Sequence, residues 1–268
     1  MADEVITTDH NEPTYGNSDV NQDDLILQQQ RDLEKEISEK IALVGLKENL
    51  STLESEYDSD DIYRQKVQDL SSKYKSIRRT RPDGNCFFRG FAFAYFERLL
   101  ENQEEYKRFR DVALHSKDFL ISLGFPQFTL EDFHDTFMEV VDLVGKGPDA
   151  QEALYAKFND QGYSDYVVVY LRLLTSGQLQ KQANFYKYFI EGDRTVADFC
   201  SQEVEPMFKE SDHIHIIALS AAFNVGVRVR YMDRGTTPEV IAHDFPENCT
   251  PAIHLLYRPG HYDILYPG

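Results

Sequence analysis

The apolar residues change their spacing near residue 225, and this change limits the chain to folds in which a helix-rich part is followed by a sheet. Before it, apolar residues recur in steps of three and four, which place them on one face of a helix. After it, segment 225–231 (VGVRVRY) alternates apolar and polar residues, the period of a strand. Segments 253–257 and 261–266 are two further expected strands, separated by a Pro-Gly turn.

The residues before that change predict a series of helices. Segment 164–174 is rich in Val and Tyr, which favours a strand, but its apolar residues are nearly continuous, and we favour a helix. Two of the helix starts show capping chemistry, Thr129 with Asp132 and Thr195 with Asp198. The expected helices cover residues 60–74, 87–100, 103–123, 129–144, 150–158, 164–174, 178–190, 195–204 and 215–223.

The first 45 residues divide into two segments. Residues 1–20 are polar and aperiodic, so we expect a disordered acidic tail. Apolar residues then recur at helical spacing, so residues 21–45 are expected to form an amphipathic helical arm. Its apolar stripe fits two interpretations, packing on the main domain or binding a partner. No linker interrupts residues 46–268, which we interpret as one domain.

The chain is strongly acidic, with a formal charge of −18 and 17 acidic against 4 basic residues up to Asp61. Such a chain repels phosphate groups, so we expect a protein partner and neither nucleic acid nor membrane. It has no apolar run of bilayer length and no signal-peptide pattern, so we expect a cytoplasmic protein that can also be nuclear. The basic run 73–81 is interpreted as a solvated face.

The metal-binding residue types are sparse. The three cysteines, Cys86, Cys200 and Cys249, form no CxxC pair, which argues against a disulfide framework or a zinc site. His213 and His215 lack a matching set of cysteines or carboxylates. We therefore expect no metal and no cofactor, and we interpret Cys200 and Cys249 as structural.

Cys86 follows a glycine turn, in Asp83-Gly84-Asn85-Cys86, and starts an expected helix. Unpaired N–H groups and the dipole at a helix start favour the thiolate, which is the nucleophilic form of cysteine. The glycine lets the backbone approach a substrate carbonyl, so that N–H groups of the loop can stabilise an oxyanion. A lone cysteine is more often a small buried hydrophobe, so this motif alone leaves both interpretations open.

A second motif, Gly260-His261-Tyr262-Asp263, opens the last expected strand. Side chains at positions i and i+2 of a strand share one face. Asp263 can therefore hold the His261 ring while the other ring nitrogen faces a thiol, as in a catalytic triad. The two motifs together predict a nucleophile, a base and an orienting group.

The stretches TRPDGNCFFR and YRPGHYDILY resemble the otubain branch of the ovarian-tumour-domain cysteine proteases. EDFHDTF, SDYVVVYLRLLTSG, QEVEPM and ESDHIHIIAL match as well, and the resemblance extends from about residue 50 to the end. It implies an α/β (α+β) fold of the papain-like kind, with a helical lobe packed on a small, mainly antiparallel sheet.

The resemblance also implies an activity, that of a deubiquitinase that hydrolyses isopeptide bonds in polyubiquitin. Cys86 would attack the carbonyl, His261 would act as general base and then acid, and Asp263 would orient His261. Asp83 matches a position whose loop helps to form the oxyanion hole. Its side chain is expected to fix that loop, while backbone N–H groups bind the oxyanion. Otubains prefer the chain type that marks proteins for the proteasome.

The implied binding surfaces are for ubiquitin and for ubiquitin-conjugating enzymes. The arm at 21–45 would contact a ubiquitin, and the loops at 125–133 and 165–173 would face a conjugating enzyme. Core or rim packing explains the positions matched to the ubiquitin tail equally well. Those positions are Tyr231, Asp233, Tyr257 and Tyr262.

Two other functions remain open, and we expect a monomer in each case. The chain could act mainly as a non-catalytic inhibitor of charged ubiquitin-conjugating enzymes, because binding needs only a surface and not the thiol. It could also cleave ordinary peptide bonds, because amide and isopeptide carbonyls react alike.

Overall fold

A six-stranded sheet in the order β1-β2-β6-β5-β3-β4 is the frame of the structure. The computed structural model describes residues 40–268. Every neighbouring pair of strands is antiparallel except β3 and β5, which are parallel. The strands are β1 (Val44–Asn49), β2 (Tyr74–Thr80), β3 (Val227–Tyr231), β4 (Ile241–Phe245), β5 (Ile253–Arg258) and β6 (His261–Pro267).

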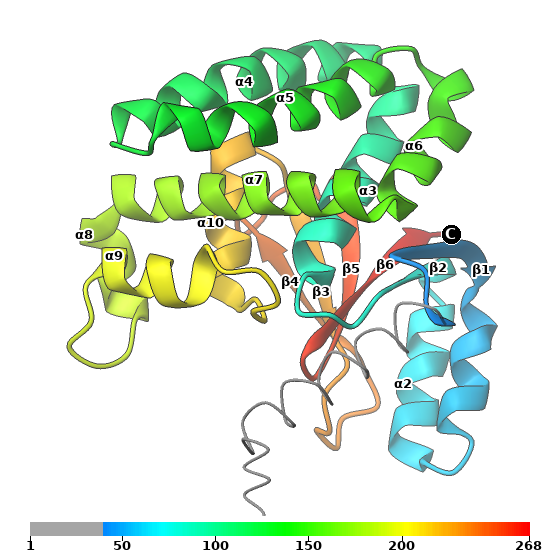
Figure 1. Cartoon of the computed structure of the whole chain (residues 1–268). Coiled ribbons are helices and arrows are strands. Elements are labelled where there is room, and N and C mark those ends of the chain that lie inside the picture. Colours follow the sequence, from blue (N-terminus) through cyan, green and yellow to red (C-terminus); the bar gives the residue numbers. More distant parts are fainter. Residues whose placement is uncertain (1–39) are drawn as a thin grey trace, which may run out of the picture. The chain divides into compact units, whose positions relative to one another are not determined.

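Helices cover both faces of this sheet. Figure 1 shows α4, α5 and α7 gathered beyond α3 on one side, and α2 beside the β1–β2 side. The α-helices are α2 (Asp61–Ser71), α3 (Cys86–Glu101), α4 (Gln103–Ser122), α5 (Gln127–Val144), α6 (Gln151–Asn159), α7 (Gln161–Lys181), α8 (Ala183–Tyr186), α9 (Val196–Phe199) and α10 (His213–Phe223). The 3₁₀ turns are η1 (Leu50–Tyr57), η2 (Pro148–Ala150) and η3 (Lys187–Phe189), and η4 (Cys200–Val204) is a π-helix.

Successive residues of the central strands face two different cores, because side chains alternate across a strand. Leu255 of β5 and Ile264 of β6 pack in the larger core, with the helical lobe. Leu256 and Leu265, one residue further on, pack in the smaller core with η1 and α2. The expected helical lobe on a small, mainly antiparallel sheet is confirmed.

Helix α3 carries Cys86 to the sheet. Its first eleven residues, CFFRGFAFAYF, are all buried, as expected of a helix that is apolar on every side. Gly90 faces the sheet, where an added Cβ would lie 3.6 Å from side-chain atoms of Thr80 and Ile264. The rings of Phe87 and Tyr262, which follow Cys86 and His261 in sequence, have centroids 5.4 Å apart. The start of α3 therefore lies beside the start of β6.

Three of the strands differ from the sequence expectations, since β1, β2 and β4 were not expected. Among the described residues, the expected helix 21–45 is wrong for residues 41–45, because 41–43 are not helical and Val44 and Gly45 form the start of β1. The expected helix 60–74 ends at Ser71, and Tyr74 begins β2. The expected tail 1–20 and residues 21–39 of the arm lie outside the described residues.

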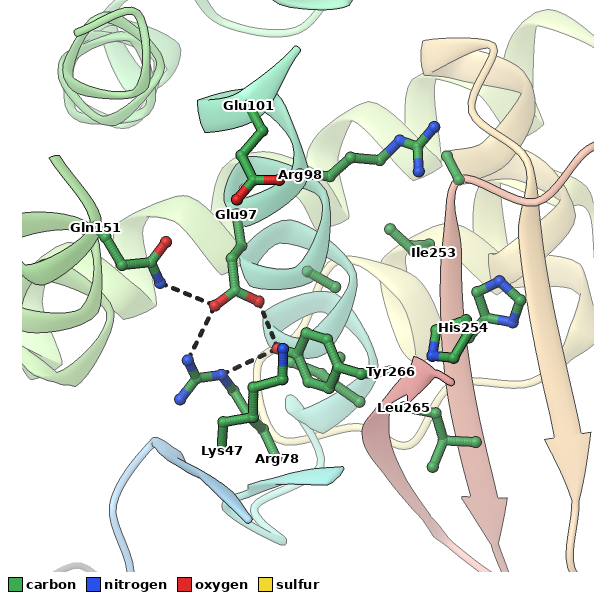
Figure 2. Close-up of a pocket in the computed structure, with 14 residues that line it drawn as sticks. Lys47, Arg78, Glu97, Arg98, Glu101, Gln151, Ile253, His254, Leu265 and Tyr266 are labelled. Atoms are coloured by element: carbon green, nitrogen blue, oxygen red, sulfur yellow. Dashed lines mark hydrogen bonds and ion pairs between the residues drawn. The ribbon is translucent and has the colours of Figure 1, made fainter. Parts of the chain in front are cut away.

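The basic run 73–81 spans β2 and one residue on each side of it. Its interpretation as a solvated face is wrong for Arg78 and Arg81, which are buried. Figure 2 shows why Arg78 is held inside. Its guanidinium donates to Glu97 Oε1 at 2.9 Å and to Tyr266 Oη at 3.0 Å. Glu97 also accepts from Gln151 at 2.8 Å and from the Tyr266 hydroxyl at 2.5 Å. This network ties β2 and β6 to α3 and α6.

The helices agree better with expectation. Segment 164–174 is helical within α7, and Thr195 forms the expected capping box. The capping box expected at Thr129 is wrong, because α5 already begins at Gln127 after Pro126. The helix expected over 178–190 is divided, because α7 ends at Lys181 and two short elements follow.

Residues 41–268 form a compact unit of their own. Among residues 40–268, no helix combines the length and the apolar character needed to cross a membrane.

Removal of the Glu97 carboxylate should destabilise this unit. Glu97→Ala leaves the buried Arg78 guanidinium without its anion, and breaking a buried ion pair costs about 3–5 kcal/mol. We expect the free energy of unfolding, measured by urea denaturation, to fall by at least about 2 kcal/mol. Glu101→Ala, at an exposed position of the same helix, is the control and should change it by less than about 0.5 kcal/mol. Equal effects of the two substitutions would contradict the role of the network.

Candidate active site

The loop before Cys86 is fixed by Asp83. One carboxylate oxygen, Oδ1, accepts the backbone N–H of Asn85 at 2.9 Å. Both carboxylate oxygens lie within 2.9 Å of Nη1 of Arg89, which is fully buried in the next turn of α3. The Asp83 side chain therefore closes the turn on itself and ties it to the helix that follows.

Gly84 is required by the shape of this loop. Its φ of +74° is in the left-handed region, which strains residues that carry a Cβ. A Cβ at this position would also overlap the backbone of Phe208. The loop 83–85 and the segment that contains Phe208 are therefore in direct contact.

Cys86 is the first residue of α3, and its side chain is 3% exposed. The preceding residue, Asn85, does not cap the helix with its side chain. Its Oδ1 instead accepts from Arg172 at 2.9 Å and from the backbone N–H of Phe208 at 3.0 Å. The N–H groups of the first turn of α3 therefore remain available to a negative charge near the Cys86 sulfur.

His261 and Asp263 lie at positions i and i+2 of β6, and His261 Nε2 is 2.9 Å from Asp263 Oδ1. Asp263 is completely buried. The same oxygen accepts the backbone N–H of Thr80 at 2.9 Å, and Oδ2 accepts from Arg258 at 2.6 Å. Burial would raise the pKa of Asp263, but His261, Arg258 and Thr80 lower it below its usual value. The carboxylate is therefore ionised at neutral pH.

The His261 imidazole has a strongly shifted pKa. Burial lowers the pKa of His261, but Asp263 and the neighbouring Cys86 sulfur outweigh burial and raise it to about 9. The ring is therefore an imidazolium at neutral pH. Because the folded-state pKa lies above the usual 6.5, this interaction stabilises the fold fully below about pH 6.5 and is lost as pH rises through about 9.

The three tyrosines matched to a ubiquitin-tail site form one row across the sheet. Tyr262 pairs with Tyr257 in register, and Tyr257 pairs with Tyr231, with ring centroids 5.0 Å apart in each case. Tyr262 is 3% exposed and donates its hydroxyl to the Ser211 carbonyl, whereas the other two are half-buried. Asp233, two residues after Tyr231, forms an ion pair of 2.8 Å with Lys66 on α2.

Sequence reasoning missed two arginines of this site. Arg258 donates to Asp263 and also reaches Glu56 at 2.9 Å. Its position opposite His261 in the β5–β6 hairpin is the signal that could have found it. Arg172, in the middle of α7, reaches Asn85 and carries no local signal beyond a charge inside a nearly continuous apolar run.

A cluster of exposed aromatic side chains was also missed. Phe185, Tyr188 and Phe189, on α8 and η3, are 52%, 80% and 51% exposed. The rings of Phe185 and Phe189 have centroids 5.2 Å apart. The dense run NFYKYF was a usable signal, since one buried helix face cannot hold so many aromatic residues.

The other two cysteines and His215 have structural surroundings. Burial raises the pKa of Cys200 to about 11 and also raises the pKa of Cys249. His215 Nδ1 accepts the backbone N–H of Asp212 at 3.0 Å. In the described part of the chain, no group of three or more His, Cys, Asp and Glu side chains could hold a metal ion.

The fold and these side chains define the site of a cysteine-type hydrolase. A thiol starts a helix, an imidazolium lies on the neighbouring strand, and a buried carboxylate holds the imidazolium. The loop before the thiol is fixed on both sides, which suits it to present N–H groups to an oxyanion.

Comparison with known proteins identifies the family. The model of the family Peptidase C65 Otubain matches residues 36–267. The chain is 54% identical over 245 residues to Ubiquitin thioesterase OTUB1 of Homo sapiens, covering 91% of this chain and 90% of the relative. It is 42% identical over 263 residues to the ovarian tumor domain-containing deubiquitinating enzyme 1 of Arabidopsis thaliana, covering 90% and 86%. The chain belongs to the otubain family.

Solved structures agree with this assignment. A chain in "The structure of h/ceOTUB1-ubiquitin aldehyde-UBCH5B~Ub" is 36% identical, with a TM-score of 0.86, and the match covers 91% of this chain and 98% of that chain. A chain in the corresponding UBC13~Ub structure has the same identity and TM-score and covers 92% and 98%. The expected otubain resemblance and fold class are therefore confirmed.

Replacement of Asp263 should change the titration of His261. Asp263→Asn removes the negative charge that holds the imidazolium, so the pKa of His261 should fall from about 9 toward 6.5. The measurement is an NMR pH titration of the ring protons. Asp244→Asn, which removes a carboxylate paired with Arg228 on β3 and β4, should leave the His261 titration unchanged. An unchanged midpoint in Asp263→Asn would show that Asp263 does not set the charge of the ring.

Proposed function

We propose that this chain is a cysteine-type deubiquitinase that hydrolyses isopeptide bonds in polyubiquitin, with Cys86 as the nucleophile. The observation that carries the proposal is the juxtaposition of Cys86 with a His261 imidazolium held by the buried Asp263. The relatives named ubiquitin thioesterase and the neighbour solved with ubiquitin aldehyde support ubiquitin as the substrate. Of the chain types, we propose the one that marks proteins for the proteasome.

The proposed reaction begins with Cys86 in its thiolate form beside the His261 imidazolium. The Cys86 thiolate attacks the isopeptide carbonyl carbon, and the negative charge that develops on the carbonyl oxygen is stabilised by backbone N–H groups of the loop 83–86. His261 donates its proton to the leaving lysine amine, and the C–N bond breaks to give a thioester. His261, now neutral, takes a proton from water, and the resulting attack on the thioester releases the ubiquitin carboxylate and restores the thiolate.

The raised pKa of His261 suits the first step, because the ring already carries the proton that the leaving amine needs. Asp263 holds the ring through Nε2, so Nδ1 is the nitrogen that serves Cys86 and the leaving group. Asp83 has a supporting role, since its carboxylate is engaged by Asn85 and Arg89 and holds the loop.

The row of tyrosines offers a path for the ubiquitin tail. It runs from Tyr262 beside α3 to Tyr231, whose ring stacks on His213 with centroids 5.1 Å apart. The exposed Phe185, Tyr188 and Phe189 supply an apolar surface for the body of the substrate, since exposed aromatic clusters mark protein-binding sites. Asp233 is better suited to hold α2 through Lys66 than to bind the tail.

Cys86→Ser should abolish cleavage of linkage-defined ubiquitin dimers. A serine hydroxyl is far less acidic than a thiol, so the rate should fall by at least about a thousandfold. Gel analysis of dimer and monomer measures the loss, and Cys249→Ser should retain activity because this thiol lies outside the site. The same assay with casein tests the alternative function, because cleavage of casein would indicate a protease of ordinary peptide bonds. Dimers that stay intact with the unmodified chain, for every linkage, would refute the proposal.

A second function is favoured by an exposed residue on α5. Phe128 is 88% exposed, and nearby Phe133 and Tyr166 have ring centroids 5.0 Å apart. These residues lie in or beside the segments 125–133 and 165–173 that the family resemblance assigns to conjugating enzymes. The neighbours solved with UBC13~Ub and UBCH5B~Ub support the same partner class. We infer that this face binds a ubiquitin-conjugating enzyme and restrains it without using Cys86.

Phe128→Ala should weaken binding of a ubiquitin-charged conjugating enzyme by about tenfold, as expected for the loss of an aromatic anchor. Calorimetry measures the affinity, and dimer cleavage should stay unchanged. Leu114→Ala, which truncates an exposed apolar residue on α4, is the matched control and should bind normally. A truncation that tests the arm should stop at residue 39, because Val44 already belongs to the sheet. Unchanged affinity in Phe128→Ala would remove this face from the interaction.

A further inference from the structure

Arg172 is a buried cation without a carboxylate partner. Its side chain, in the middle of α7, is completely buried. Within residues 40–268, no carboxylate oxygen lies within 4.0 Å of its guanidinium. Its hydrogen-bond partners are three backbone carbonyls and one side-chain amide oxygen, and its Cζ lies 4.6 Å from the centroid of the Phe88 ring.

These partners belong to two segments that are far apart in sequence. Nη2 of Arg172 lies 2.9 Å from the carbonyl oxygen of Gly84 and 2.9 Å from Oδ1 of Asn85, both in the loop before Cys86. The same nitrogen lies 2.7 Å from the carbonyl oxygen of Lys209, and Nη1 lies 3.0 Å from that of Val204. One guanidinium therefore joins the nucleophile loop to segment 204–209.

The two segments also contact each other directly, which reinforces the connection. Asn85 Oδ1 accepts the N–H of Phe208 at 3.0 Å, and Gly84 has no room for a Cβ against Phe208. Carbonyl oxygens around a guanidinium form a cage of fixed geometry, because the planar fork donates only in set directions. A Lys ammonium cannot reproduce four such contacts at once.

The charge of Arg172 faces the reacting group. Burial lowers the pKa of Arg172 to about 10, and attraction to Asp83 and to the Cys86 sulfur opposes this effect. The guanidinium is therefore charged at neutral pH. Asp83 is already paired with Arg89. Arg172 bonds the two residues that directly precede Cys86, so its charge adds to that of the His261 ring when a thiolate forms at Cys86. A buried cation and a buried anion stabilise each other, since each lessens the cost of burying the other.

We propose that Arg172 is a positioning residue for the reaction at Cys86, holding the oxyanion loop through its four acceptors and stabilising the thiolate by its charge. This inference rests on the proposed thiol hydrolysis. It makes segment 204–209 part of the active site, because a displacement of its carbonyls would release Arg172 from Gly84 and Asn85.

Two substitutions separate the two parts of this role. Arg172→Met removes both the charge and the hydrogen bonds. Arg172→Lys keeps the charge but loses the planar guanidinium that makes the hydrogen bonds. Arg78→Lys is the matched control, since Arg78 is also buried and also bonds a backbone carbonyl, but it lies in the network with Glu97. Thermal unfolding of each variant reports on folding.

The measurements are the rate of Cys86 alkylation by iodoacetamide against pH, mapped by mass spectrometry, and kcat and KM for ubiquitin dimers. Arg172→Met should slow alkylation at neutral pH by about tenfold, which corresponds to a shift of one unit in the pH profile. Arg172→Lys should alkylate nearly as the unmodified chain does. Both variants should lose kcat by about tenfold to a hundredfold with little change in KM, because misplaced oxyanion donors act on the transition state. Arg78→Lys should show neither effect.

Normal alkylation and normal kcat in Arg172→Met would overturn the proposal, and equal effects in Arg78→Lys would reduce it to general stability. If Arg172→Met does not fold, Arg172→Lys decides through kcat. If neither variant folds, hydrogen exchange decides. Cys86→Ser replaces the thiol with a hydroxyl that cannot become an anion beside Arg172, so amides of residues 204–209 should exchange faster. Unchanged exchange would refute the inference. An unmodified chain that leaves every dimer intact, yet shows slowed alkylation in Arg172→Met, would refute the proposed function and retain the inference.

Discussion

The buried carboxylate of Asp263 is the interaction on which the site and the centre of the sheet both depend. It accepts the backbone N–H of Thr80 on β2 and the ring of His261 on its own strand, and its second oxygen accepts from Arg258 on β5. Three adjacent strands therefore meet at one ionised group. A buried carboxylate is tolerated only when such donors satisfy it. The same donors fix the direction in which it presents a charge to His261.

The charges around the site differ in sign from the net charge of the chain. The chain is acidic, yet cations hold the segments around Cys86 and His261, namely the buried Arg89 on α3, the buried Arg172 on α7 and the half-buried Arg258 on β5. Each binds backbone or side-chain oxygens that hold a catalytic segment in place. Net charge therefore describes which partners approach the surface, whereas the proposed chemistry at Cys86 depends on local charges.

The sequence was most informative where one local rule acted alone. The glycine turn before Cys86 and the i, i+2 spacing of His261 and Asp263 predicted an arrangement that the structure brings together, and long apolar periodicities predicted the helices of the lobe. Strands β1 and β2 were missed because β1 is an exposed edge and the basic residues of β2 hide its period. Arg172 could not be found in this way, because its partners lie about 30 to 90 positions away in sequence. Such contacts depend on the tertiary fold and leave no local pattern.

The two halves of the site sit on parts of the fold with different resistance to local opening. His261 and Asp263 lie on β6, which is bonded on both sides by β2 and β5, so exposing them requires disruption of the sheet itself. The nucleophile loop is instead braced by segment 204–209, which begins at the last residue of a short π-helix and belongs to no strand. Segments of this kind open with a smaller free energy than central strands. His261 and Asp263 therefore share the cooperative stability of the whole unit. The position of the Cys86 thiol can vary without unfolding of that unit.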